Sequence, residues 1–127
     1  MMQLAFDLTG GCAGEPPLGA GEPIDRAHLA RMTYGDRSLE RELLELFDRQ
    51  ATLLLARMRD SEAAAMAGLA HTLKGSAAGI GAHGVASAAA AAEGAARAAP
   101  AERRAALDRL TAAVERVRPE IADILAG

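Results

Sequence analysis

Residues Ser38–Arg59 read SLERELLELFDRQATLLLARMR, and the order of apolar and charged residues in this stretch decides the fold class. Its apolar side chains recur at spacings of three, four and seven, which places them on one face of an α-helix. Asp36 or Ser38 can cap this helix, because a short polar side chain accepts hydrogen bonds from first-turn backbone amides. The stretch therefore predicts a long amphipathic helix, whose expected buried side chains are Leu39, Leu43, Leu46, Phe47, Leu54, Leu55 and Met58.

The same kind of spacing predicts further helices over residues 25–33, 61–80, 85–99 and 101–126. Asp25 is the expected cap of the first, with Ile24 packing before it, and Gly35 ends it. The segment 85–99 is nearly all alanine and must pack tightly against something larger, whereas Pro119 is expected to bend the last helix. The inward positions are Met66, Leu69, Leu73, Ala77 and Ile80 in one helix and Leu107, Leu110, Val114, Val117, Ile121 and Ile124 in the last. We predict an all-α fold, an antiparallel four-helix bundle with a short extra N-terminal helix.

Composition supports helices and narrows the class of protein. Hydrophobic residues make up 50% of the 127 residues but aromatic residues only 2%, so the apolar content is mostly alanine and leucine. The net charge of −3, with acids and bases interleaved, gives no basic patch for a nucleic acid. No apolar run approaches a membrane span, no secretory signal pattern begins the chain, and Cys12 has no partner for a disulfide. We expect a cytoplasmic protein.

Residues 1–24 differ from the rest of the chain. Eight glycines and prolines from Gly10 to Pro23 break any regular element, and the apolar residues have no helical period. We expect a flexible or loosely docked leader over 1–24, in which Met2 to Leu8 could still fold onto the bundle. Residues 25–127 then form the bundle domain.

His71 is the residue whose surroundings point to chemistry. A helix turns by about 100° per residue, so Leu69 and Leu73 lie about 160° from His71 and point inward while the imidazole points out. Its own face, within about 60°, holds Ala67, Gly68, Lys74, Gly75 and Ala78. A lone histidine on a helix is ordinarily a solvated surface residue, but here alanines and glycines surround it, with one lysine one turn away.

The two glycines of this face require an explanation. Each costs about 1 kcal/mol relative to alanine inside a helix, and alanine abounds in this chain. Clearance supplies the reason, since a partner's active site must come within bonding distance of the imidazole. Lys74 can place its ammonium beside a phosphoryl group on His71, whose neutral imidazole is nucleophilic near physiological pH.

The segment His71-Thr72-Leu73-Lys74-Gly75-Ser76-Ala77, followed by Gly81-Ala82, resembles the signature of histidine-containing phosphotransfer (HPt) domains. The resemblance implies that His71 accepts a phosphoryl group from a receiver-domain aspartate and passes it to another receiver. It also implies that Lys74 steadies the phosphoryl group, that Gly75 is kept small for docking and that Ser76 lies at a helix contact. Gly79 departs from the pattern, since many members carry a polar residue there.

The resemblance implies a phosphorelay intermediate of two-component signalling, a monomeric carrier rather than an enzyme. Its partners would be response-regulator receiver domains or a hybrid histidine kinase, with no cofactor of its own and Mg²⁺ only in the receiver. Two alternatives remain: a regulator that binds receivers or kinases without transfer, and a structural helix bundle. A kinase dimerisation helix is disfavoured because Thr72 and Ser76 stand where an acid and a proline are usual, and no nucleotide motif occurs.

Other candidate residues have weaker support. Metal binding at His71 is not expected, because Lys74 and Gly75 at the helical neighbour positions are not suitable ligands. For His28 and His83 we expect surface or packing roles. Asp25, Arg26 and Met32 could lie near the docking face, as the first helix of the family often does.

Overall fold

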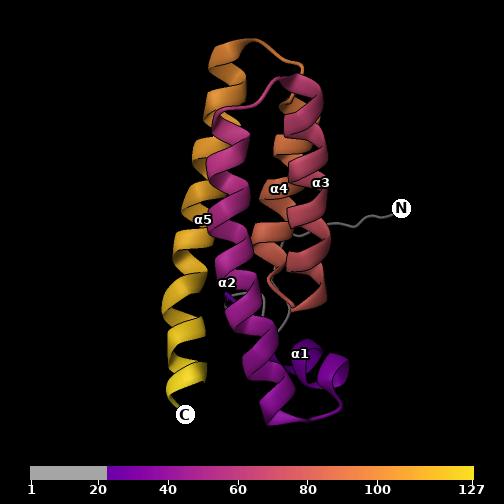
Figure 1. The fold of residues 1–127 in the computed structure, drawn as a ribbon, viewed down its shortest axis with the longest axis vertical. Coiled ribbons are helices and arrows are strands. Elements are labelled where there is room, and N and C mark those ends of the chain that lie inside the picture. The colour runs from indigo at the N-terminus through magenta and orange to yellow at the C-terminus, as the bar shows by residue number, and fades with distance from the viewer. Residues whose placement is uncertain (1–22) are drawn as a thin grey trace, which may run out of the picture.

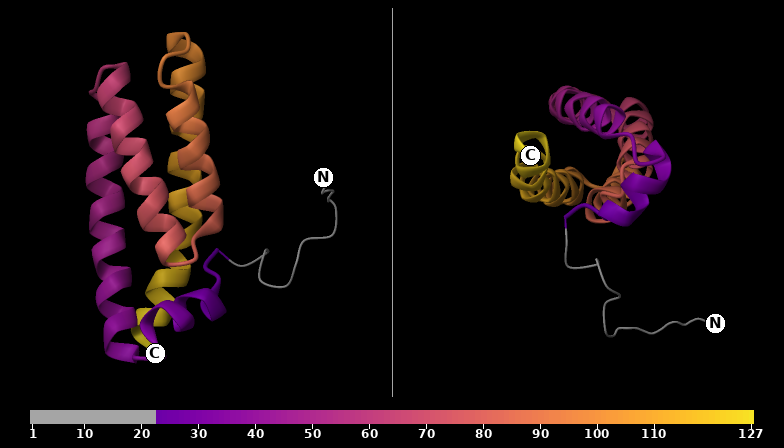
Figure 2. Two further views of the ribbon diagram at one scale, coloured as in Figure 1. Left: turned by 90° about the vertical axis from the view of Figure 1, so that its right-hand side faces the viewer. Right: turned by 90° about the horizontal axis from the view of Figure 1, so that it is seen from below.

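The computed structural model describes residues 23–127, and within this range every regular element is a helix. The helices are α1 (Arg26–Thr33), α2 (Arg37–Arg59), α3 (Ala63–Gly79), α4 (His83–Ala95) and α5 (Pro100–Ala126). Figure 1 shows α2 to α5 as an antiparallel bundle, and Figure 2 shows α1 lying across its lower end. Around the bundle, α2 packs on α3, α3 on α4, α4 on α5 and α5 again on α2. The predicted fold class is confirmed.

Capping residues determine where the first two helices begin. Asp25 accepts from the His28 amide at 3.0 Å, and Asp36 accepts from the Leu39 amide at 3.1 Å. Tyr34 ends α1 in the left-handed conformation, with φ of 55°, and Gly35 follows with φ of 74°. The short first helix and the reversal into α2 are thus specified locally, as the sequence predicts.

The last two helices differ from the prediction at their ends. α4 ends at Ala95 rather than at Ala99, and Pro100 is the first residue of α5 instead of only a breaker. A proline fits there because the first backbone amide of a helix has no intrahelical partner. Pro119 lies inside α5, which continues to Ala126.

The core confirms the inward face of α5 completely, since all six predicted residues of that helix are buried. In α3, Ala70 is fully buried while Leu69 is only partly covered. The prediction for Leu46 is wrong, because its side chain is 51% exposed and Leu44 is fully buried instead. The buried stripe of α2 steps by three and four through Leu44, Phe47, Ala51, Leu54 and Met58.

The start of the described chain is tied to the turn between α3 and α4. Ile24, the last residue of the predicted leader, is fully buried in the core, while residues 1–22 lie outside the described range. The Asp25 amide donates to the Gly81 carbonyl at 2.8 Å. Gly81 has φ of 81°, and an added Cβ would lie 2.7 Å from the Asp25 carbonyl oxygen. Glycine is therefore required at this turn.

No helix in residues 23–127 is both long enough and apolar enough to cross a membrane.

Candidate functional site

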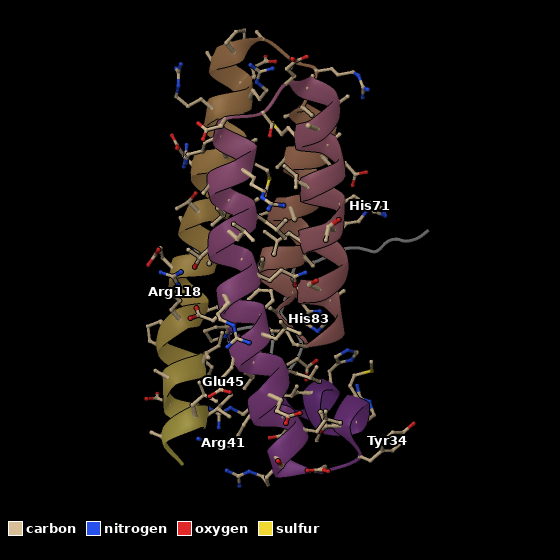
Figure 3. All side chains as sticks on the ribbon, viewed as in Figure 1. Tyr34, Arg41, Glu45, His71, His83 and Arg118 are labelled. Carbon is tan, nitrogen blue, oxygen red and sulfur yellow. The ribbon has the colours of Figure 1, made fainter. Side chains whose placement is uncertain are left out.

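His71 lies on α3 and presents its imidazole to solvent. Its side chain is 66% exposed, while Ala70 and Leu73 on either side are fully buried. Figure 3 shows the imidazole projecting from the outer side of α3. The exposed ring and the buried leucine follow from their angular separation on one helix.

No side chain projects from the surface on either side of the imidazole at Gly68 and Gly75. A Cβ added at Gly68 or at Gly75 would meet no atom within 4 Å. Nothing inside the described protein therefore requires glycine at either position. Ala78 is also exposed, whereas Ala67 is half-buried against the core and contributes less to the predicted docking face.

Glu93 of α4 joins His71 and Lys74 into one cluster. Its Oε2 lies 3.2 Å from His71 Nδ1, and its Oε1 accepts from Lys74 Nζ at 3.2 Å. The helical spacing around His71 places no acid on this face, so Glu93 is a residue of the cluster that the sequence did not predict. One signal was present: Glu93 is the only charged residue between His83 and Arg97 in an otherwise small-residue helix.

The packing of α4 brings Glu93 to this position. Its buried residues are Val85, Ala89 and Ala92, followed by Ala96. Small side chains allow the backbones of two helices to approach closely, so the next residue of α4 can reach across to α3. The lysine-to-carboxylate contact in turn crosses the boundary between the two helices.

Glu93 is held in its ionised form. The hydrogen bond from the Lys74 ammonium lowers the pKa of Glu93 below its usual value of 4.5, although partial burial opposes the shift. The charge of Lys74 and the neighbouring His71 add to the lowering. A carboxylate at Glu93 can only accept hydrogen bonds, so the neutral imidazole is held with its proton on Nδ1.

A shallow apolar hollow begins at Gly75 and extends over α2 and α1. Its exposed large apolar side chains are Met32, 50% exposed, and Leu46, which was predicted to lie in the core. The complete lining is Met32, Leu43, Leu46, Phe47, Gln50, Gly75, Ser76, Gly79 and Ile80. Ser76 Oγ donates to Gln50 Oε1 at 2.9 Å, which places Ser76 at the contact of α3 with α2.

The other predicted candidates lie elsewhere. His83 Nε2 is 3.1 Å from Asp25 Oδ2, and the His28 and His83 rings meet edge to face at 5.8 Å. The hydrogen bond from the His28 amide, followed by that from His83, lowers the pKa of Asp25. These residues fasten α1 to the turn before α4.

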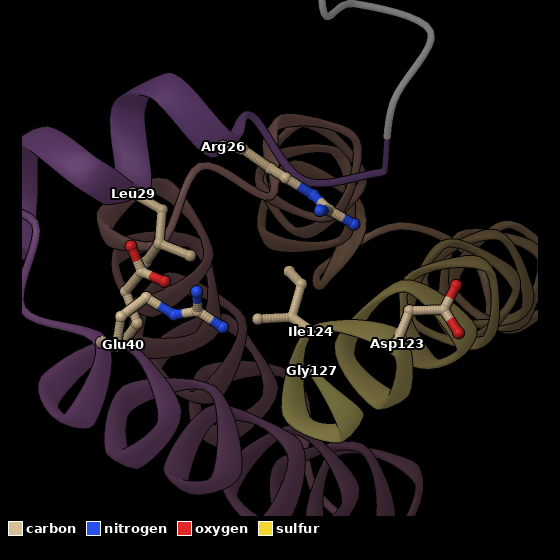
Figure 4. Close-up of a pocket in the computed structure, with 7 residues that line it drawn as sticks. Arg26, Leu29, Glu40, Asp123, Ile124 and Gly127 are labelled. Carbon is tan, nitrogen blue, oxygen red and sulfur yellow. The ribbon is translucent and has the colours of Figure 1, made fainter.

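Arg26 pairs with Glu120 of α5 at 2.7 Å. It lines an opening at the lower end of the bundle, together with Leu29 and Ile124 (Figure 4). Of the three α1 candidates, only Met32 therefore borders the hollow beside Gly75. Within residues 23–127, no group of three potential metal ligands comes together.

The bundle and its exposed histidine define a helical protein with an accessible imidazole on its surface. The model of the Hpt domain family matches residues 37–120, which include His71, Lys74 and Glu93. The chain belongs to the Hpt domain family. Proteins of this family carry phosphoryl groups on histidine in two-component signalling and interact with receiver domains and histidine kinases. No curated protein and no solved structure gives a significant match.

Proposed function

We propose that His71 Nε2 accepts a phosphoryl group from the aspartate of one receiver domain and passes it to the aspartate of another. The observation that carries the proposal is the contact of His71 Nδ1 with the Glu93 carboxylate on an open surface. Because the carboxylate holds the proton on Nδ1, the lone pair of Nε2 is free and directed to solvent.

The transfer step needs no reactant other than the two partners, and it releases no other product. The Nε2 lone pair forms a bond to phosphorus as the phosphorus–oxygen bond to the receiver aspartate breaks, and the bond electrons return to the aspartate as carboxylate. The ring gains positive charge, which Glu93 offsets through the Nδ1 proton. The reverse sequence delivers the phosphoryl group to the second receiver.

Lys74 stabilises the phosphorylated form in this proposal. Its ammonium lies one helical turn from His71 and is paired with Glu93 at 3.2 Å. A phosphoryl group on Nε2 brings about two negative charges at neutral pH, more than a carboxylate carries. Lys74 then shifts toward the phosphoryl oxygens, while the second oxygen of Glu93 keeps its contact with Nδ1.

The receiver docks over the low surface formed by Gly68 and Gly75 and over the apolar hollow. The hollow supplies apolar area through Met32 and Leu46, and the glycines let the receiver's aspartate reach Nε2. The proposal assigns Mg²⁺ and the acidic cluster to the receiver, and it assigns the nucleophile and one cation to this chain.

The test is transfer from a phosphorylated receiver to the full chain and to His71→Gln. Label should reach the wild type only, and it should be lost in acid and kept in base, as a phosphoramidate requires. Undiminished label on His71→Gln, or no label on the wild type across a panel of receivers, would refute the proposal. Receiver binding measured in parallel distinguishes the alternative, because a regulator without transfer would bind receivers and acquire no label.

A further inference from the structure

A second surface lies between α4 and α5 and does not take part in the proposed transfer. It is a hollow of about 470 Å³ lined by Gly84, Ser87, Ala88, Ala91, Arg109, Ala112 and Arg116. Between Gly84 and Ala92, Ser87 is the only polar residue of α4, although most of this outer face is exposed. A surface helix normally carries charged or polar side chains on its outer face. This face of α4 has the composition of a covered surface.

Two arginines border the hollow on α5. Arg109 and Arg116 are exposed and form no ion pair with any side chain of residues 23–127. Seven residues separate them, two turns of helix, so both point along the same side about 10 Å apart. The occupant of the hollow should therefore be apolar on one side and acidic on the other.

Residues 1–22, which the structure does not describe, have this composition. They contain Asp7, Glu15 and Glu22 and no lysine or arginine, so the net charge of −3 arises entirely in this segment. Leu4, Phe6 and Leu8 surround Asp7 and supply apolar side chains. The stretches of residues 23–127 that combine acids with large apolar side chains and no base, such as 42–48, already belong to helices of the bundle.

The described chain also begins at the foot of this hollow. The Asp25 amide is bonded to the Gly81 carbonyl at 2.8 Å, and Gly84, the first lining residue, follows three positions later. Figure 2 shows the start of the described chain at the lower end of α4, on the side where α4 packs against α5. The hollow spans about 10 Å from Gly84 to Ala91, while thirteen residues between Leu8 and Glu22 reach about 40 Å when extended.

We propose that the segment around Leu4–Leu8 binds in the α4–α5 hollow of its own chain, with Asp7 toward Arg109 and Arg116. A short tether gives an effective concentration of about 1 mM or more, so even a millimolar intrinsic affinity leaves the segment bound about half the time. The hollow lies across the bundle from the apolar hollow between α2 and α3, so the bound segment leaves the receiver surface open.

The single cysteine allows a direct test on the full chain. A nitroxide attached to Cys12 broadens the NMR signals of amides near it. If the segment binds, Ala91 at the far end of the hollow and Ala112 in its middle lose at least as much intensity as Gly84 near the exit point. If the segment is merely tethered, the loss decreases steadily with distance from Pro23, and that result would overturn the proposal.

Charge reversal supplies a matched comparison. Arg109→Glu/Arg116→Glu should abolish the intensity loss at Ala91 and Ala112, and Arg49→Glu/Arg57→Glu on exposed positions of α2 should leave it unchanged. Equal effects of both pairs would contradict the assigned site.

A mixed sample distinguishes a second copy from the chain's own segment. Chain that carries the nitroxide but no ¹⁵N is added to ¹⁵N-labelled chain that carries no nitroxide. Intensity loss at Ala91 in that mixture would mean that the hollow binds another molecule, against the proposal. The expected result is no loss in the mixture and a full loss in the singly labelled chain.

Discussion

Replacement of Gly75 by glutamine separates what this residue does for folding from what it does for transfer. Gly75 lies inside α3, and its added Cβ would meet no atom within 4 Å. Glycine costs a helix about 1 kcal/mol relative to alanine, and glutamine is among the better helix formers. Gly75→Gln should therefore raise the free energy of unfolding by roughly 0.5–1 kcal/mol, which corresponds to about 2–5 °C in Tm for a domain of this size.

The same change should slow transfer. Position 75 lies one turn after His71 and about 40° from it around the helix, so the new side chain stands on the surface that a receiver must approach. Forcing an extra side chain into a packed contact costs about 1–3 kcal/mol. At receiver concentrations below saturation, this corresponds to a transfer rate roughly 5- to 150-fold lower, because 1.4 kcal/mol is a factor of ten.

Gly75→Ala is the matched control, since it removes the same glycine but adds only a methyl group. It should give a similar gain in Tm and keep most of the transfer rate. Tm comes from calorimetry, and the rate comes from label passing from a phosphorylated receiver at several receiver concentrations. A Gly75→Gln protein that transfers at the wild-type rate would refute close approach over Gly75. A loss of stability in both variants would contradict the finding that a side chain at position 75 meets no neighbouring atom.

Three further predictions concern other parts of the molecule. Gly81→Ala should lower the free energy of unfolding by more than about 1 kcal/mol in chemical denaturation, because alanine disfavours positive φ and its Cβ would clash with the Asp25 carbonyl. Leu46→Asp should weaken receiver binding measured by calorimetry and leave Tm almost unchanged, because this leucine is half-exposed. The folded-state pKa of Glu93 lies below 4.5, so its contribution to stability is present above that pH and is lost as pH falls through the lowered value. Lys74→Met should return the carboxyl titration, followed by NMR, toward 4.5.

The sequence is sufficient to predict the fold class and the exposed position of His71, because both depend on the helical periodicity alone. In α5 each inward residue is large and apolar, so the three-and-four spacing selects the buried face without ambiguity. In α2 seven leucines lie within seventeen residues, and several stripes fit the same pattern. Which of Leu44 and Leu46 is buried depends on where α1 and α3 pack against α2. The spacing within α2 alone does not contain this information.

Glu93 could not be predicted from spacing, because its contact depends on the register between two helices. His71 and Glu93 are 22 residues apart with a turn between them. A shift of one residue in that turn would rotate Glu93 by about 100° around α4 and remove it from the imidazole. The turn is fixed by Gly81 and Asp25, two residues far from the site that hold α1 against the start of α4.

The alanine content of α4 accounts for features that appear unrelated in the sequence. On its inner side, Ala89, Ala92 and Ala96 let α4 lie close to α3, and this closeness allows one carboxylate to contact both His71 and Lys74. Larger core residues at these positions would move α4 outward and leave Nδ1 without its acceptor. Judged by hydrophobicity alone, α4 has a weak core face. The small residues of that face are nevertheless what brings Glu93 close enough to hold the proton on Nδ1 of His71.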